Sequence, residues 1–318
     1  MFRHGVHSQK LHYFLALALA IAITVPAATG FPANAQEKEK KPDPKPEAQK
    51  EDGKVPTEKE LEKSRREKEK AAPEVKLSQA EAVVEVAILA YGGREQLNKV
   101  RAAIQEEGTI RLITPEGELT GNFRLRSARG EKSWKDLLRV DLDLTPPGSS
   151  QSRATEVINY VIGFNGASVW SAQNNQYVTP SPEAEAAFRA QLSHEYMALI
   201  RYKEDGSKLE YAGPETVMGL DTHVIDLTTP DGEKTRYWVS SKSYRVLFTE
   251  YEIKLADSPA PVKYRVAYYY TPLKIVQNTL VPVRRAMYQD GKLAQEIILT
   301  NITYSAKLDP EIFQHLQG

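Results

Sequence analysis

The stretch Glu215–Leu255 constrains the fold more than any other part of this chain. It holds extended runs rich in Val, Ile, Thr, Tyr and Trp, the residues that pleated, half-buried strands favour. Turns separate the runs at Pro230-Asp231-Gly232 and at Ser240–Ser243, and the first of these combines a fixed φ with a glycine that accepts positive φ. The pattern predicts a meander of three antiparallel strands, the first reading from Thr216 to Thr229.

Extended runs separated by turns continue through most of the chain after residue 100. Apolar and polar residues alternate with period two, as expected for strands with one face packed on a core. Asn165-Gly166 lies between two such runs and predicts a hairpin with a type I′ turn. The further predicted strands lie at 103–112, 119–126, 138–144, 157–164, 167–170, 262–270, 279–289 and 293–305.

Two helical regions accompany the strands. Ser78-x-x-Glu81 is a capping-box pattern, and apolar residues at helical spacing follow it up to Tyr91-Gly92-Gly93. A short second helix over Arg94–Val100 completes a helical hairpin. The second region begins at Ser181-Pro182 and ends at Asp205-Gly206. The chain is therefore predicted to be mainly β (α+β), an antiparallel sheet with helices available to cover it.

Residues 1–35 have the pattern of an export signal. Arg3 and Lys10 supply positive charge, the apolar run Phe14–Val25 follows, and Ala33-Asn34-Ala35 fits a small-x-small cleavage site. The apolar run is shorter than the roughly 20 residues that a spanning helix needs. Cleavage and export to a bacterial periplasm are therefore predicted, with an uncleaved N-terminal anchor as the alternative.

Residues 36–75 consist largely of Lys, Glu, Pro and Gln without an aromatic residue. Such a segment cannot bury enough apolar surface to offset the entropy of ordering, so a disordered, charged linker is predicted. The linker separates the signal from one domain at 76–318. That length, about 240 residues, lies within the range of single all-β domains.

Bulk composition excludes several classes of function. Lys and Arg number 42 and Asp and Glu number 42, so the basic excess of a nucleic-acid-binding protein is missing. The sequence has no cysteine, which excludes disulfides, thiol catalysis, Cys-ligated zinc and a lipid-modified cysteine.

Catalytic motifs are not found. His194-Glu195 lacks the second histidine of a zinc-protease motif because position 198 is alanine. Asp221 and His223 share a strand face, but two ligands do not make a metal site. Asp141 and Asp143 alternate like paired carboxylates and read more simply as the solvated face of a strand. The prediction is a protein that is not an enzyme and carries no metal or cofactor.

Apolar surface is abundant instead. A sheet that curls without closing would leave a concave apolar trough, which is a binding site for apolar ligands. An ordinary core, in which helices and sheet fill one another, fits the same pattern. Both interpretations remain open at this point.

Several short motifs resemble the LolA/LolB-like superfamily, the outer-membrane lipoprotein-sorting proteins. They are an export signal, a helix ending in Y-G-G, the run E-E-G-T-I-R-L, and G-F-N-G-A-S-V-W followed by a helical insert. Further matches are G-L-D-T-H-V-I-D-L, Y-W-V-S-S-K-S-Y-R-V and L-D-P-E-I-F. The resemblance implies a curved antiparallel sheet forming an unclosed half-barrel covered by helices, with a hydrophobic cavity that receives acyl chains.

A periplasmic, monomeric carrier for the acyl chains of lipids or lipoproteins is the function that this resemblance implies. The alternatives are an envelope-stress sensing or regulatory module that docks on a membrane protein, and a hydrolase on the same scaffold. Arg124, Arg126 and Arg139 are candidates for the arginine that closes the lid in the small carriers. The predicted cavity residues are Phe123, Leu125, Val140, Leu142, Ile225, Trp238, Phe248 and Tyr251.

Overall fold

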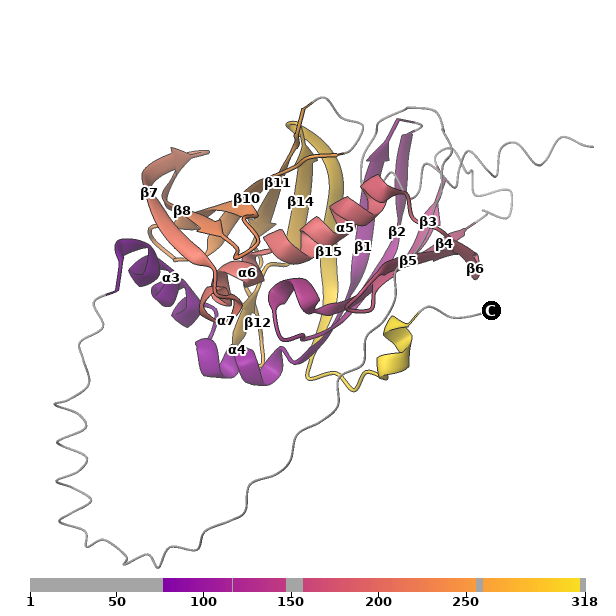
Figure 1. Ribbon diagram of the computed structural model, residues 1–318, viewed down its shortest axis with the longest axis horizontal. Helices are drawn as coiled ribbons and strands as arrows, with labels where there is room; N and C mark the ends of the chain where they lie inside the picture. Colours follow the sequence, from indigo (N-terminus) through magenta and orange to yellow (C-terminus); the bar gives the residue numbers. More distant parts are fainter. Residues whose placement is uncertain (1–76, 116, 147–156, 256–259, 315–318) are drawn as a thin grey trace, which may run out of the picture. The chain divides into compact units, whose positions relative to one another are not determined.

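The computed structural model describes residues 77–115, 117–146, 157–255 and 260–314, so the predicted signal and linker lie outside the described residues. In the described part, one antiparallel sheet of 13 strands runs in the order β6-β5-β4-β3-β2-β1-β15-β14-β11-β10-β9-β8-β7. β6 and β7 form its two edges and do not pair with each other, so the sheet is open. Helices lie across one face, here called the inner face (Figure 1). The predicted fold class is confirmed.

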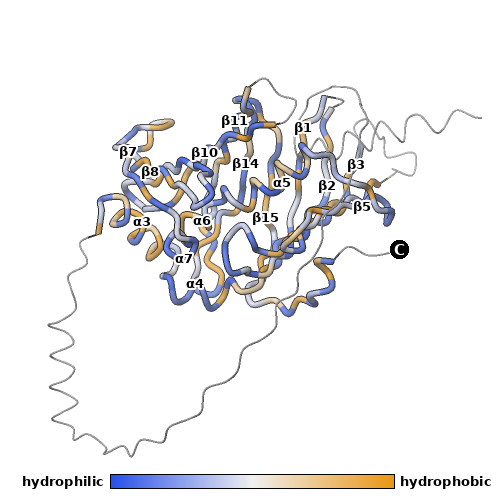
Figure 2. Tube along the Cα trace, in the orientation of Figure 1, coloured by the Kyte–Doolittle hydropathy of each residue, from blue (hydrophilic) through white to orange (hydrophobic). Residues whose placement is uncertain are grey.

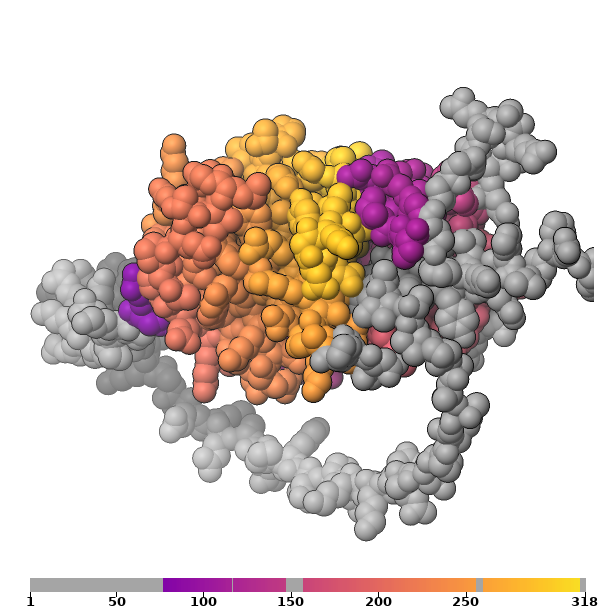
Figure 3. All heavy atoms as spheres, turned by 90° about the horizontal axis from the view of Figure 1, so that it is seen from above, coloured from indigo at the N-terminus to yellow at the C-terminus, as the bar shows by residue number. Residues whose placement is uncertain are grey.

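The first and last long strands meet in the middle of the sheet. β1 pairs with β15, so the early strands form one half and the late strands the other. Seen from above, yellow β15 lies between the orange late strands and purple early residues (Figure 3). The early strands are β1 (Ala103–Thr114), β2 (Gly117–Ala128), β3 (Leu137–Thr145), β4 (Ile158–Phe164), β5 (Val169–Gln173) and β6 (Gln176–Val178). The late strands are β7 (Lys208–Val217), β8 (Leu220–Thr228), β9 (Lys234–Ser240), β10 (Val246–Ile253), β11 (Val262–Tyr269), β14 (Arg284–Gln289) and β15 (Lys292–Tyr304).

Short elements complete the chain. The N-terminal helices are α3 (Gln79–Ala90) and α4 (Arg94–Val100), and the predicted capping box between Ser78 and Glu81 is present. The second helical region is split into α5 (Pro182–His194), α6 (Tyr196–Ile200) and α7 (Tyr202–Asp205). The remaining elements are the hairpin of β12 (Lys274–Val276) and β13 (Thr279–Val281) and the 3-10 turns η1 (Ser133–Lys135) and η2 (Pro310–Phe313).

Several predicted runs differ from the observed strands. The run from Thr216 to Thr229 is broken by a turn at Met218-Gly219, where both residues have positive φ, so the meander has four strands. The run 279–289 is likewise divided between β13 and β14. The Asn165-Gly166 hairpin exists, but its loop has four residues because the Asn165 side chain accepts hydrogen bonds from the backbone of Ala167 and Ser168. The type I′ prediction is wrong there.

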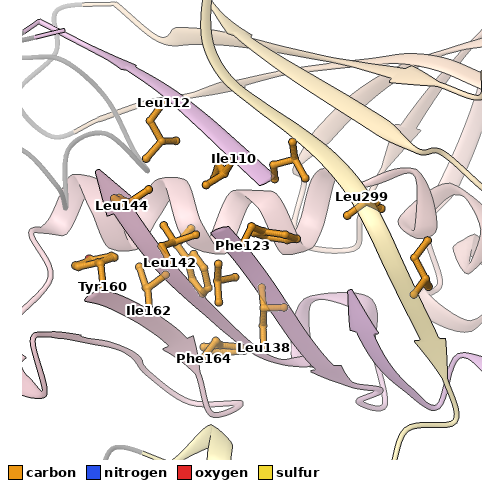
Figure 4. Packing of buried hydrophobic residues seen from close by; sticks show 14 of the residues in the cluster. Ile110, Leu112, Phe123, Leu138, Leu142, Leu144, Tyr160, Ile162, Phe164 and Leu299 are labelled. Atoms are coloured by element: carbon orange, nitrogen blue, oxygen red, sulfur yellow. The ribbon is translucent and has the colours of Figure 1, made fainter. Parts of the chain in front are cut away.

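Apolar and polar stretches alternate along the chain (Figure 2). Most of the buried apolar side chains belong to clusters on the inner face. In the early half these are mainly aliphatic, and Figure 4 shows Ile110, Leu142 and Leu144 among them. In the late half, α3 and α6 pack on an inner face rich in tyrosine. Ala184, Ala187 and Ala190 place α5 against β10, β11 and β14.

One tryptophan explains the G-F-N-G-A-S-V-W motif. The Trp170 ring lies against Gly163 on the neighbouring strand, where a Cβ atom would come within 2.5 Å of the ring. Trp170 Nε1 donates a 2.8 Å hydrogen bond to the carbonyl of Phe313, which ties η2 to this edge of the sheet. Any side chain at position 163 would displace the indole.

Candidate ligand-binding cavity

A cavity of about 150 Å³ lies between the inner face of the sheet and helices α5 and α6. For comparison, an engineered apolar cavity of roughly this size binds benzene. Its walls come from β1, β2 and β3 on one side and from β10, β11, β14 and β15 on the other. The apolar lining residues are Ile104, Ile110, Phe123, Leu125, Leu138, Val140, Leu192, Met197, Val266, Met287 and Ile297.

Strand alternation builds the aliphatic wall. In the pairing of β2 with β3, Phe123 lies opposite Leu142, and Leu125 lies opposite Val140. The intervening residues point outward and are charged. Because one register places all the apolar side chains on one face, a slip by a single residue would turn them all to solvent.

Helices α5 and α6 form the roof of the cavity. Gln191, Leu192 and Met197 line it from the helices. Glu195 is both the C-cap of α5 and the N-cap of α6, with an extended backbone at φ −66° and ψ 160°. The roof is therefore two helices joined at one non-helical residue, and that residue also lines the cavity.

An ion-pair cluster lies within the cavity wall. Arg285 donates to Glu106 at 2.6 Å and to Glu195 at 3.1 Å, which links β14, β1 and the roof. Partial burial raises the pKa of Glu195, whose side chain is 41% exposed, and the charge of Arg285 opposes that rise. The Glu106–Arg285 pair is about nine-tenths buried, so breaking it would leave a charge without a partner in a dry site.

Arg101 lines the cavity close to this cluster. It follows the last residue of α4 and is 6% exposed. Its Nη2 donates to the hydroxyl oxygens of Tyr196 and Tyr304, both at 2.7 Å. The guanidinium carbon also lies 5.5 Å and 5.0 Å from the centroids of these two rings. The site thus holds a guanidinium that is packed among neutral phenols.

A second cluster of charged residues lines the cavity near the turn between β2 and β3. Arg201 contacts Asp136 at 2.8 and 2.9 Å, and Arg129 pairs with Glu204 of α7. Burial raises the pKa of Asp136, against the opposing effect of Arg201. These contacts fasten the end of the helical region to the sheet.

His194 ends α5 and lines the cavity while it is 3% exposed. Its ring stacks on Tyr251 with centroids 4.2 Å apart, and its Nδ1 lies 2.6 Å from Thr235 Oγ1. Burial lowers the pKa of His194 to about 4. The imidazole is therefore neutral at pH 7 and acts as a hydrogen-bonding wall residue.

The eight predicted cavity residues fall into three groups. Phe123, Leu125, Val140 and Tyr251 line the cavity. Leu142 and Ile225 point to the same face but are buried in the core beside it. Trp238 and Phe248 lie in a cluster on the outer face with Val224 and Ala267. The role of all eight in binding a ligand stays a prediction.

The other candidate residues lie away from the cavity. Arg126 and Arg139 both pair with Asp141 on the outer face, and Arg124 pairs with Glu107 there. Asn159 donates to Asp143 at 2.5 Å.

Asp221 and His223 of β8 contact β7: Thr216 donates to Asp221 at 2.8 Å, and the Tyr211 hydroxyl lies 3.1 Å from His223 Nδ1. Within the described residues, no group of three or more His, Asp or Glu side chains could hold a metal ion. No described helix has the length and apolar character needed to cross a membrane.

Arg101 and Arg285 were not predicted from the sequence. Arg101 meets Tyr304, which lies 203 residues away, and Arg285 meets Glu106, which lies 179 residues away. One signal was present on β1, where Glu106 has the same inward parity as Ile104, Ile110 and Leu112.

Comparison with known proteins gives similarity in structure only. No family model matches the chain, and no curated protein sequence matches it. A DUF1329 family protein from Desulfovibrio piger superposes with a TM-score of 0.49 and 14% identity, covering 75% of this chain and 98% of its own.

A putative outer membrane lipoprotein-sorting protein domain from Vibrio parahaemolyticus has a TM-score of 0.47 and 15% identity, covering 74% and 97%. A LolA superfamily protein from Nitrosomonas europaea has a TM-score of 0.44 and 16% identity, covering 75% and 99%. At these TM-scores the similarity carries no conclusion about activity or ligand.

Proposed function

We propose that this chain is a non-enzymatic binding or carrier protein that holds the acyl chain of a lipid or lipoprotein in the cavity between sheet and helices. The observation that carries the proposal is the cavity itself, which has an aliphatic wall from β1, β2 and β3 under a roof of α5 and α6. Each methylene that leaves water contributes about 0.8 kcal/mol, so a chain can be held by the apolar wall alone.

The present volume sets a requirement on this function. A cavity of about 150 Å³ accepts a group the size of benzene. A longer acyl chain requires α5 and α6 to move away from the sheet. In such a movement α5 would leave contacts that it makes to the late strands through Ala184, Ala187 and Ala190 and to the early strands through Phe188. Export to the periplasm belongs to the same proposal and depends on the signal at residues 1–35.

A filling substitution tests the proposal. Leu125 is partly buried and lines the cavity, so Leu125→Trp should fill it without burying a charge. Titration of the full-length protein with the fluorescent fatty acid cis-parinaric acid should show at least about tenfold weaker binding than wild type, the loss expected for one or two displaced methylenes.

Leu247→Trp is the matched control, because Leu247 packs against the outer-face cluster. It should bind as wild type does, and circular dichroism should be unchanged in both variants. Absence of binding to wild type, or equal binding to Leu125→Trp, contradicts the proposal.

A further inference from the structure

Three unpartnered polar atoms lie in the wall of this one cavity. Arg101 Nε, Arg285 Nε and Gln295 Oε1 are buried without a hydrogen-bond partner among the described residues, and all three residues line the cavity. Buried polar side-chain atoms in native proteins are nearly always paired, so such a concentration calls for an explanation. Four other buried atoms also lack a hydrogen bond, and their residues lie outside the cavity wall: Arg111 Nε, Arg126 Nε, Tyr160 OH and Tyr264 OH. Of these, Arg111 Nε forms an ion pair with Glu296 at 3.3 Å.

Four arginines line the cavity, and they differ in their partners. Arg285 is held by Glu106 and Glu195, Arg201 by Asp136, and Arg129 by Glu204. Arg101 has no carboxylate within bonding distance in the described part of the chain. It donates only through Nη2, to two tyrosine hydroxyls.

Those tyrosines do not neutralise Arg101. Burial raises the pKa of Tyr304 and raises the pKa of Tyr196 well above the ordinary value, so both phenols are uncharged at pH 7. An arginine stays charged under all ordinary conditions. Two carboxylates, Glu106 and Glu195, act electrostatically on Arg101, and Arg285 already bonds to both, at 2.6 Å and 3.1 Å. A buried cation without its own counter-ion costs free energy unless an anion reaches it.

We propose that the ligand of this cavity is an amphiphile with a single anionic head group, a carboxylate or a phosphate monoester, and that Arg101 receives the head. This inference rests on the proposed function. Arg101 directly follows α4, and Ile104 and Ile110 on the adjoining β1 line the aliphatic wall. A head at Arg101 therefore lies at one end of an apolar wall that accepts the tail. Gln295 Oε1 offers an acceptor for a hydroxyl or amide N–H beside the head.

The test compares probes with the same tail and different heads. Laurate, lauryl phosphate, lauryl alcohol and laurylamine compete with the neutral dye N-phenyl-1-naphthylamine for the full-length protein. Laurate and lauryl phosphate should bind at least about tenfold more tightly than the alcohol, as expected for one charge-assisted hydrogen bond. Laurylamine should bind most weakly. Acetate and inorganic phosphate should not displace the dye, because they have no tail for the apolar wall.

Variants locate the effect. Arg101→Gln should bring the affinity for laurate down to that for the alcohol, while the affinity for the alcohol is kept. Arg124→Gln, on the outer face, should keep the preference of wild type. Should Arg101→Gln fail to fold, Arg101→Lys retains the charge and should keep a reduced preference, and the wild-type comparison stands independently.

The two proposals fail in different ways. Equal binding of laurate and lauryl alcohol to wild type overturns the anionic head group and leaves the carrier function intact. A preference that survives in Arg101→Gln overturns the assignment to Arg101. If free phosphate displaces the dye as effectively as lauryl phosphate does, the proposal that the ligand is an amphiphile is overturned. If none of the four probes binds, the carrier function itself fails and the head-group site with it.

Discussion

The early and late strands use the two faces of the sheet differently. In β2 and β3 the inner face is aliphatic and the outer face carries the ion pairs of Arg124 and Arg126 with Glu107 and Asp141. In β9, β10 and β11 the inner face is rich in aromatic rings, and the outer face combines an apolar cluster with the ion pairs of Arg236 and Arg265. The inner face carries Tyr237, Tyr251, Tyr264 and Tyr268, and the outer face carries Trp238, Phe248 and Ala267.

The difference gives the cavity two unlike walls. The early half offers a mainly aliphatic wall, which suits a lipid tail, with Glu106 on β1 and Arg129 and Asp136 near the turn between β2 and β3 as its charged members. The late half offers ring faces together with hydroxyls, an imidazole and Arg285, which suit polar contacts. On the outer face, the Arg265 guanidinium lies over the Trp238 ring at 5.0 Å from its centroid, so this side chain covers part of the outer-face cluster. In the late half, the inner face is therefore expected to contact the ligand and the outer face to stabilise the fold. Substitutions on each face can test the two roles independently.

The largest effect is expected at the inner ion pairs. Arg285→Met leaves Glu106 and Glu195 without their partner and should lower the free energy of unfolding by about 3–5 kcal/mol, measured by urea denaturation. Most of the loss should come from Glu106, because the Glu195 side chain is 41% exposed. The outer pair Arg236–Asp226 is the control, with exposed fractions of 47% and 32%. Arg236→Met should cost less than about 1 kcal/mol, and equal losses would contradict the distinction between the faces.

The outer aromatic cluster should support the fold without touching the ligand. Phe248 is 9% exposed and packs beside Trp238. Phe248→Ala should lower the free energy of unfolding by about 3 kcal/mol because it opens a cavity in that cluster. Its affinity for cis-parinaric acid should equal that of wild type. Loss of ligand binding in a variant that remains folded would show that the outer face takes part in binding.

His194 makes the late wall sensitive to acid. The pKa of His194 is about 4 in the folded protein, against an ordinary value of 6.5, so the unfolded chain binds the proton first as pH falls. Stability from this group is present above pH 6.5 and is lost between pH 6.5 and pH 4. Linkage gives a loss of about 2 kcal/mol between pH 7 and pH 5.

The matched variant isolates this contribution. His194→Phe keeps an aromatic ring against Tyr251 and removes the titration. The unfolding free energy of wild type minus that of His194→Phe, measured by urea denaturation, should therefore fall by about 2 kcal/mol from pH 7 to pH 5. A difference independent of pH would exclude the buried neutral imidazole.

The smallest effect is expected on the outer face of the early half. Arg124 pairs with Glu107 at 3.1 Å with side chains 53% and 31% exposed. Arg124→Gln should change the free energy of unfolding by less than about 1 kcal/mol and leave ligand binding as in wild type, by thermal denaturation and dye titration. A loss of several kcal/mol would make the outer ion pairs as important as the inner ones.

The same contrast explains what could be predicted from the sequence. On β3, Leu138, Val140, Leu142 and Leu144 alternate with polar residues, so the inner face could be identified and is confirmed. On β9, the consecutive residues Tyr237, Trp238 and Val239 are all buried, so alternation does not distinguish the faces. Trp238 and Phe248 were therefore grouped with inner residues although they lie outside.

Contacts over long sequence separations could not be predicted. Arg101 and Arg285 acquire their partners only when β1 meets β15 and the roof lies over them. Local signals were sufficient for helix caps, such as the capping box at Ser78 and the left-handed Gly206 after α7. The Met218-Gly219 turn could not be predicted, because a methionine rarely adopts a positive φ.

The central claim is that the cavity takes a hydrocarbon tail, and paramagnetic NMR tests it most directly. A fatty acid with a nitroxide near the end of its chain is added to the full-length protein labelled at Ile, Leu, Val and Met methyl groups. Methyl signals of Leu125, Val140 and Met197 should broaden, while those of Val224 and Leu247 on the outer face should stay sharp. Uniform broadening of both sets, or sharp signals throughout at saturating fatty acid, would contradict the account.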